Sequence, residues 1–412
     1  MNKIIWSGRS HNFSDNEVKY LTNVIRTADP LTNGKELRIF EKELKKYLKV
    51  KNVFATSSAA ASLEIIALLL NLKKNDEIII PAHTYCASAI SFARNGAKII
   101  WADIDFASRV VSENDIIKKI NKNTKAIVIV HLYGFMFNVS KLKRKINKKI
   151  KIIEDCAQAF GAEMNFKKAG TLGDFSCFSF HAQKNLTTLG EGGAIYVKSN
   201  KLAKKIPGLR HNGHAPYSKR KHYWKPAMGD LIEDLPHAWP YKFSLTEIQS
   251  AAGHLMLKRI DKLNADRINR AKKFIKSMEY KNDLIFHSNF ENKRHVYHLL
   301  VAYCSSLKLR DFLISELYLK HKIQCVVQYY PLYKYPLFSK KGLQKADCPN
   351  TEKFFNNMIS FPFHHWMPAK DFNRIITVTN KLIEKFKKND KKKIKKELKQ
   401  FLIKNKENIS DF

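Results

Sequence analysis

The sequence lacks an apolar run of the ~18 residues that a membrane-spanning helix requires, and its first residues, MNKIIWSGRS, contain no apolar stretch typical of a secretory signal. Its six cysteines are scattered, without a C-x-x-C pair or the spacing of metal ligands. We therefore expect reduced thiols, no metal site and no membrane partner, in a soluble protein of the cytoplasm.

Acidic side chains are also scarce, since 37 Asp and Glu stand against 74 Lys and Arg and leave a net charge of +37. Such an imbalance permits binding to nucleic acid, anionic membranes or phosphorylated metabolites. The lysines are spread along the whole chain, however, and Lys-rich usage with only 15 glycines is also typical of AT-rich genomes. The charge by itself therefore favours compositional bias over any particular partner.

The composition, with 44% hydrophobic and 11% aromatic residues, is that of a folded protein, and 412 residues suit one large and one smaller domain. Strand-like apolar runs alternate with helical segments in the first two-thirds, at residues 77–81, 97–104, 126–132 and 151–155. This alternation predicts an α/β fold with a mainly parallel sheet. Because ligands bind beyond the carboxyl ends of such strands, residues 81–88 and 155–161 are candidate site loops.

The last third has a different pattern. A long helix is expected over residues 244–276, and strands at 295–303 and 324–330 alternate with helices, as in a smaller α+β domain. We therefore divide the chain into residues 1–270 and 271–412. Residues 380–405 form a Lys-rich pattern with apolar positions at helical spacing. This segment is either a basic arm for anionic partners or a surface helix that packs one apolar stripe.

The most informative segment is GDFSCFSFHAQKNLTTLGEGGAIYV, residues 173–197, in which two strand-like pieces flank a polar loop with a single lysine, Lys184. A lysine at strand ends becomes a nucleophile towards an aldehyde when burial or a neighbouring cation removes its proton. Ser179 offers a hydroxyl to a phosphate, and the glycines at 190, 192 and 193 permit a tight backbone path. Taken alone, however, Lys184 is better explained as a solvated surface lysine, one of many in this chain.

A second segment, IEDCAQAFGA at residues 153–162, places Asp155 at the end of an apolar strand. A carboxylate there is costly unless it faces a cation, and a pyridinium nitrogen is such a cation. Gln158, one helical turn further, is placed to bind an oxygen of the same ring. The alternative is that Asp155 caps a helix over the following residues.

Together these segments resemble the DegT/DnrJ/EryC1/StrS family of sugar aminotransferases, which have fold type I. TNGKELRIFEKEL, NDEIIIPAHTYCASA and VHLYG resemble further family motifs, and the similarity extends from about Leu31 to Phe363. EDCAQAFGA and FSFHAQKNLTTLGEGGA are the most specific, because both occur in the family's order and spacing. The resemblance implies a large cofactor-binding domain (1–270) with a mainly parallel seven-stranded sheet, a small C-terminal α+β domain (271–412) and a homodimer.

The resemblance also implies pyridoxal 5'-phosphate as cofactor and assigns roles by position. Lys184 would bind the cofactor covalently and move protons between cofactor and substrate carbons. Asp155 would pair with the pyridinium nitrogen, Gln158 would contact the phenolic oxygen, and Tyr85 would stack on the ring. The phosphate would be held by Ser179 and by a turn at a helix N-terminus, formed by Ser58, Ala59 and Ala60.

The sequence departs from the family pattern at three places. The S-G-T phosphate turn reads Ser58-Ala59-Ala60, without the threonine hydroxyl. The N-x-R that reaches the site from the partner subunit aligns with Lys242-Phe243-Ser244, so that Lys242 would meet the phosphate while the arginine is lost. The H-Y-x-P-L pattern begins with Gln328.

The substrate-binding residues are expected in an aromatic and basic stretch, residues 214–243. Tyr223 and Trp224 would stack on a sugar or base, and Arg220 would meet a diphosphate. The alternative is a long loop that packs at a dimer interface. His181 also lies near the expected substrate, although for both His181 and His131 a packed, hydrogen-bonded histidine is the simpler interpretation.

The resemblance implies transfer of an amino group from glutamate to a keto-sugar, which is expected to be nucleotide-linked. The product would serve amino-sugar biosynthesis for surface polysaccharide or related glycans. One alternative is a sugar dehydratase that uses the pyridoxamine form, but such relatives have histidine where this chain has Lys184. Another is a non-catalytic DNA-binding regulator, for which the sequence contains no helix-turn-helix pattern. We therefore expect small-molecule substrates and no nucleic-acid partner.

Overall fold

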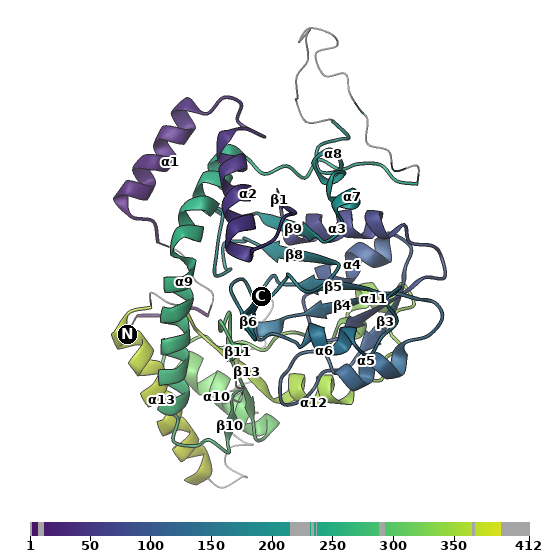
Figure 1. Ribbon diagram of the computed structural model, residues 1–412. Coiled ribbons are helices and arrows are strands. Elements are labelled where there is room, and N and C mark those ends of the chain that lie inside the picture. Colours follow the sequence, from purple (N-terminus) through teal and green to yellow (C-terminus); the bar gives the residue numbers. More distant parts are fainter. Residues whose placement is uncertain are drawn as a thin grey trace.

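The computed structural model describes residues 2–6, 12–214, 231, 235, 237–287, 293–364 and 367–388. Its centre is a seven-stranded sheet in the order β1-β9-β8-β5-β4-β2-β3 (Figure 1). The sheet pairs are parallel except where β9 runs antiparallel to its neighbours β1 and β8. The strands are β1 (Val53–Thr56), β2 (Glu77–Pro81), β3 (Lys98–Ala102), β4 (Thr124–Val130), β5 (Lys151–Asp155), β8 (Phe175–Ser179) and β9 (Gly193–Val197). The expected mainly parallel seven-stranded sheet is confirmed.

Both faces of the sheet are buried, because successive strand residues enter different hydrophobic clusters. Cys177 and Ile195 pack in the larger cluster, whereas Phe178 and Ala194 belong to another. The helices of this part are α1 (Asp15–Thr27), α2 (Lys35–Leu48), α3 (Ala59–Leu70), α4 (Ala87–Arg94), α5 (Glu113–Lys119), α6 (Val139–Lys143), α7 (Asn200–Ala203), α8 (Ile206–Leu209) and the start of α9 (Glu247–Lys276). Burial on both faces explains why the strands are continuous apolar runs.

Helix α3 carries the most apolar sequence of these helices and sets one edge of the site. The helix begins directly after the N-cap Ser58. Gly193 in β9 passes directly against this first turn: a Cβ there would lie 2.4 Å from the Ser58 carbonyl carbon and 2.6 Å from the Ala59 nitrogen. The glycine therefore allows the strand and the helix N-terminus to approach closely.

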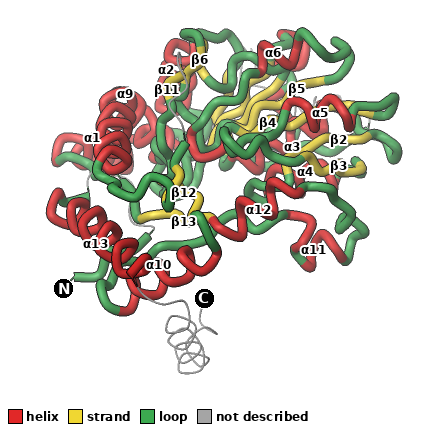
Figure 2. The backbone as a smooth tube through the Cα atoms, turned by 90° about the horizontal axis from the view of Figure 1, so that it is seen from below, coloured by secondary structure: helices red, strands yellow, loops and turns green. Residues whose placement is uncertain are grey.

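A separate antiparallel sheet, β10-β12-β13, lies in the C-terminal part, and Figure 2 shows its strands β12 and β13. It packs in a cluster that also contains Ile4 and the end of α9. The proposed boundary at residue 270 falls inside α9, which contributes Leu263 to a large-sheet cluster and Phe274 to this one. The elements are β10 (Leu284–Ile285), β12 (Leu300–Cys304), β13 (Met358–Phe361), α10 (Leu307–Leu319), α11 (Pro336–Ser339), α12 (Pro349–Asn357) and α13 (Ala369–Lys388).

A third, small sheet joins β6 (Glu163–Met164) to β7 (Lys167–Lys168) and β11 (Lys293–Arg294).

The prediction of a strand over residues 324–330 was wrong. Only Val326 bridges to Ser360, after which the chain turns towards the large sheet, where the Tyr133 hydroxyl donates to the Gln328 carbonyl at 2.9 Å. This contact with a distant residue competes with strand pairing.

The described part of the Lys-rich C-terminal segment is the end of α13. Leu382 and Ile383 are buried and Phe386 packs beside them, so this part is a surface helix with one apolar stripe. Residues 389–412, which contain the rest of the predicted pattern, lie outside the described residues. Among the described helices, none combines the length and apolar character needed to cross a bilayer.

Candidate active site

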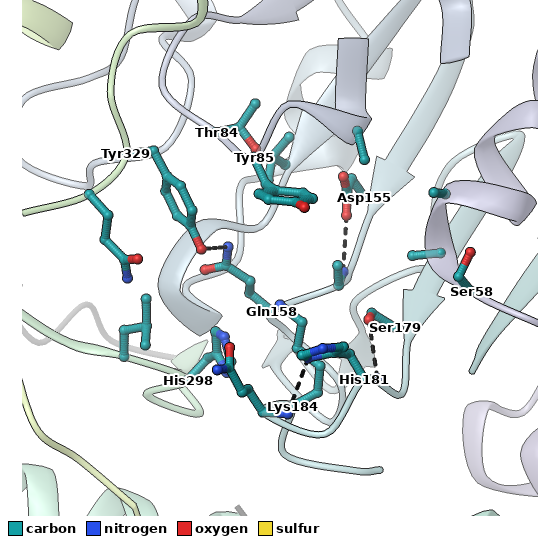
Figure 3. A pocket seen from close by; sticks show the side chains of 18 of the residues that line it. Ser58, Thr84, Tyr85, Asp155, Gln158, Ser179, His181, Lys184, His298 and Tyr329 are labelled. Atoms are coloured by element: carbon teal, nitrogen blue, oxygen red, sulfur yellow. Dashed lines mark hydrogen bonds between the residues drawn. The ribbon is translucent and has the colours of Figure 1, made fainter. Parts of the chain in front are cut away.

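A cavity of about 730 Å³ opens at the carboxyl ends of β1, β2, β5 and β8 (Figure 3). Its walls come from the loops after these strands and from the C-terminal part of the chain, which contributes His298, Gln328 and Tyr329. The cavity thus lies where parallel sheets bind ligands, and it includes most of the residues selected from the sequence. These are Ser58, Ala59, Ala60, Tyr85, Asp155, Gln158, Ser179, His181 and Lys184.

Asp155 ends β5 as a buried carboxylate facing the cavity. The Ser88 hydroxyl donates to its Oδ2 at 2.7 Å, and the Ala157 backbone N–H donates to its Oδ1 at 3.0 Å. The residues after Asp155 form turns rather than a helix, so the helix-cap alternative was wrong. Two donors hold the carboxylate in place without neutralising it, and it can therefore face a cationic ligand.

Lys184 lies in the loop between β8 and β9, where its backbone N–H donates to the His181 carbonyl at 2.9 Å. Lys184 is partly exposed, and it lines the cavity. Burial disfavours the ammonium form and lowers the pKa of Lys184 to about 8, against the opposing effect of the Asp155 charge. The solvated-lysine alternative was therefore wrong, and this amine is readily converted to a nucleophile.

Gln158 has a fixed orientation. Its Oε1 accepts from the Tyr133 backbone N–H at 2.9 Å, and its Nε2 donates to the Tyr329 hydroxyl at 3.0 Å (Figure 3). Tyr133 is fully buried, and its hydroxyl also lies 2.7 Å from His83 Nε2. This connected group positions the Gln158 amide in the cavity. Its predicted contact with a ring oxygen remains a prediction.

The opposite end of the cavity suits a phosphate. The Ser58 hydroxyl accepts from the Ala61 N–H at 3.0 Å as the N-cap of α3, and Ala59 and Ala60 form the first turn. Ser179 accepts from the His181 N–H at 3.4 Å, and its hydroxyl proton can be donated to a ligand. Serine hydroxyls beside the positive end of a helix favour an anion.

Tyr85 is 60% exposed, lines the cavity, and has its ring centroid 6.4 Å from that of Tyr329. His181 also lines the cavity, with Nε2 3.8 Å from a carboxylate oxygen of Glu191. A flat exposed ring and an imidazole are thus available to a ligand. Their predicted roles, ring stacking for Tyr85 and substrate contact for His181, remain predictions.

Lys242 is not among the described residues that line the cavity of its own chain; its Nζ lies 2.7 Å from His211 Nδ1. The sequence assigned this residue to a neighbouring subunit's site, and that assignment remains a prediction. Tyr223, Trp224 and Arg220 lie outside the described residues.

His131, Glu154 and Cys156 form a buried group close enough to suggest a metal site. The Phe137 N–H donates to His131 Nδ1 at 3.1 Å, so His131 Nε2 carries the proton that it shares with Glu154 Oε2 at 2.8 Å. Glu154 also accepts from the backbone N–H groups of Gly170, Leu172 and Gly173. With these electron pairs already used, the group is a structural network, and His131 is a packed histidine as expected.

Several residues of the cavity were not recognised from the sequence. Tyr329 belongs to the H-Y-x-P-L-like pattern and so had a signal. Ser88, which bonds to Asp155 without lining the cavity itself, belongs to the candidate loop 81–88. Arg267 and His298 had none, because α9 and the segment before β12 contain no distinctive motif around them. The fold alone brings these two side chains to the cavity.

An amine with a lowered pKa, a buried carboxylate and a serine-rich helix N-terminus in one cavity define the site of a pyridoxal-phosphate enzyme, since they fit the aldehyde, the ring nitrogen and the phosphate of that group. Residues 12–380 match the DegT/DnrJ/EryC1/StrS aminotransferase family, so the chain belongs to this family.

Individual relatives agree with this assignment. The chain is 30% identical over 353 residues, 84% of its length and 90% of the relative's, to dTDP-3-amino-3,6-dideoxy-alpha-D-galactopyranose transaminase of Aneurinibacillus thermoaerophilus. It is 28% identical over 389 residues, 92% and 97% of the two chains, to UDP-4-amino-4,6-dideoxy-N-acetyl-beta-L-altrosamine transaminase of Campylobacter jejuni. A solved structure described as a sugar aminotransferase from Streptococcus pneumoniae, in its PMP form, superimposes with a TM-score of 0.83 at 25% identity, covering 93% and 98%.

The protein is therefore an aminotransferase that uses pyridoxal phosphate, with fold type I, as the motifs around Lys184 and Asp155 predicted. The residues that line the cavity fit this cofactor.

Proposed function

We propose that this enzyme transfers the amino group of glutamate to the keto group of a nucleotide-linked sugar, in amino-sugar biosynthesis for surface polysaccharide or related glycans. The names of the dTDP- and UDP-sugar transaminases to which it is similar support the substrate class. The observation that carries the proposal is the presence of Lys184 and Asp155 in one cavity, with the pKa of the lysine lowered by burial.

The residues would divide the work as follows. Pyridoxal phosphate, when bound, supplies an electron sink for the carbon that loses its proton. Asp155 would keep the ring nitrogen protonated, Gln158 would contact the ring oxygen, and Tyr85 would cover the ring face. Lys184 Nζ would bind the aldehyde and later move protons between the cofactor carbon and the substrate carbon. The phosphate would be held by Ser58, Ala59, Ala60 and Ser179.

The enzyme is proposed to act as a homodimer in which Lys242 of one subunit reaches the phosphate of the other. Residues 214–243, with Arg220, Tyr223 and Trp224, would contact the sugar nucleotide. The six cysteines are all free and five are buried, which supports action in the reducing cytoplasm. The division into domains 1–270 and 271–412 is retained as part of this proposal.

Absorbance spectroscopy tests the reaction type. The purified protein should show the visible band of a lysine-bound pyridoxal phosphate, and Lys184→Ala should not show it. Added glutamate should bleach the band, because transamination removes the proton of the donor's α-carbon and leaves the donor's nitrogen on the cofactor. A protein that takes up no pyridoxal phosphate would contradict the proposal, and a band insensitive to every amino acid would favour the dehydratase. Salt-sensitive retention on duplex DNA would be required for the regulator.

A further inference from the structure

Arg267 lines the same cavity as Lys184, although it comes from the middle of α9. Arg267 is only 3% exposed, and its guanidinium carbon lies 5.0 Å from the centroid of the Phe363 ring. Nε and Nη2 donate to the Tyr297 carbonyl at 3.2 and 2.8 Å, and Nη2 also donates to the His298 carbonyl at 2.7 Å. These bonds hold the group rigidly and do not use Nη1.

This cation has no carboxylate partner among the described residues of the chain. Burial alone lowers the pKa of Arg267, to about 9, with no compensating acidic neighbour. Burying a guanidinium with only carbonyl oxygens for partners is costly, and a bound anion would offset that cost. The arrangement is therefore that of an anion site awaiting its ligand.

The position of Arg267 limits which anion it can bind. The His298 imidazole is buried close to both Lys184 and Arg267, since after burial these two cations are the main causes that lower its pKa. Figure 3 shows His298 beside Lys184. In an α-amino acid the amine and the carboxylate are attached to the same carbon. A donor whose nitrogen replaces Lys184 Nζ must therefore place its carboxylate within a few bonds of that point.

Other cations in the cavity are already assigned. The described residues that line the cavity include one lysine, Lys184, and one arginine, Arg267. Lys184 would bind the cofactor. The phosphate has its own serine-lined helix end around Ser58 and Ser179. Gln328 Nε2 is a further buried donor of the cavity wall, without a partner in the described part of the chain. Arg267 and Gln328 are thus hydrogen-bond donors outside the phosphate site that can bind an acceptor group of a ligand.

We propose that Arg267 is the residue that binds the carboxylate of the amino-acid donor, through a charge-assisted hydrogen bond from Nη1, which the bonds to the Tyr297 and His298 carbonyls do not use. The inference rests on the proposed aminotransferase function and assigns its donor subsite. It makes Arg267 a determinant of donor class: α-amino acids are accepted, whereas amines without a carboxylate gain nothing from it.

The test uses the holoenzyme and its Arg267→Met and Arg267→Lys variants. Arg270→Met is a matched control, because Arg270 lies one turn further on α9, stacks over Phe372 at 5.9 Å and donates to the Met367 carbonyl at 2.6 Å, but does not line the cavity. Glutarate, a dicarboxylate without an amine, is titrated against the visible band, and UDP is titrated in parallel. The rate at which glutamate or propylamine bleaches the band is then measured.

Arg267→Met should weaken glutarate binding and slow the glutamate reaction by roughly 10- to 100-fold, with a smaller loss in Arg267→Lys. The propylamine rate, UDP binding and all Arg270→Met values should be unchanged. Unchanged glutarate binding in Arg267→Met, or an equal loss with propylamine, would overturn the inference while wild-type bleaching by glutamate still upholds the aminotransferase. If Arg267→Met does not fold, the same comparison in Arg267→Lys decides.

Discussion

Ser88 Oγ donates a hydrogen bond of 2.7 Å to Asp155 Oδ2, although the two residues are 67 positions apart. Ser88 lies near the start of α4, beyond β2, and Asp155 ends β5, so the bond crosses the carboxyl edge of the sheet. Both side chains are buried. The carboxylate expected to face the cofactor is thus oriented by the first turn of α4, which follows β2 at the same sheet edge.

Ser88→Ala should weaken cofactor binding by roughly tenfold, because the hydrogen bond to a buried carboxylate is lost and Asp155 is free to turn from the ring nitrogen. Titration of the apoenzyme with pyridoxal phosphate measures this affinity. Ser91→Ala is the control, since Ser91 is similarly buried on the same helix but is not the serine that donates to Asp155. Equal affinities for the two variants would contradict the role assigned to Ser88.

The pH dependence of cofactor uptake follows from the environment of Lys184. Burial lowers the pKa of its amine from 10.5 to about 8, and only the neutral amine attacks an aldehyde. The rate of covalent uptake by the apoenzyme should therefore rise as pH increases towards 8 and level off above it. Stopped-flow absorbance at a series of pH values measures this midpoint. A rate still rising towards 10.5 would show an ordinary solvated lysine.

Tyr133→Phe should destabilise the fold by about 1–3 kcal/mol, because His83 Nε2 and the Gln328 carbonyl each lose their buried partner. The free energy of unfolding in urea measures this cost. Tyr303→Phe is the comparison: this buried tyrosine receives one longer hydrogen bond, 3.3 Å from Asn357 Nδ2, and its loss should cost less than about 1 kcal/mol. Similar costs for both variants would refute the importance of the Tyr133 network.

Acid should destabilise the protein through buried histidines. Burial lowers the pKa of His83 to about 3 and that of His295 to about 4, whereas the unfolded chain takes up these protons near 6.5. The stability contributed by the neutral native imidazoles is present above pH 6.5 and is lost as pH falls towards 4. Each histidine adds a slope of up to about 1.4 kcal/mol per pH unit.

Urea unfolding between pH 7 and pH 5 checks this slope. His83→Gln should reduce the slope, since glutamine takes up no proton in the unfolded state. The prediction would be wrong if the free energy of unfolding of the wild type were the same at pH 7 and pH 5, or if it fell by the same amount in His83→Gln.

Much of the large domain could be predicted from the sequence because its signals are local. The bounds of β2 and β5 agreed with the predictions, since runs of isoleucine between polar residues are typical of strands buried on both faces. The cofactor residues Lys184 and Asp155 could be named because their motifs are contiguous. Each motif needs only its own neighbours in the chain to be recognised.

What the tertiary structure alone decided depends on contacts between distant segments. The sequence placed a strand at 324–330, but the Gln328 carbonyl bonds to Tyr133 instead. No local sequence pattern predicts the Ser88–Asp155 bond or the position of Arg267 of α9 at the cavity. Residue chemistry and motif spacing therefore determined the cofactor and the family. Long-range packing, which sets the burial of each charge and its partners, decided how that chemistry is oriented.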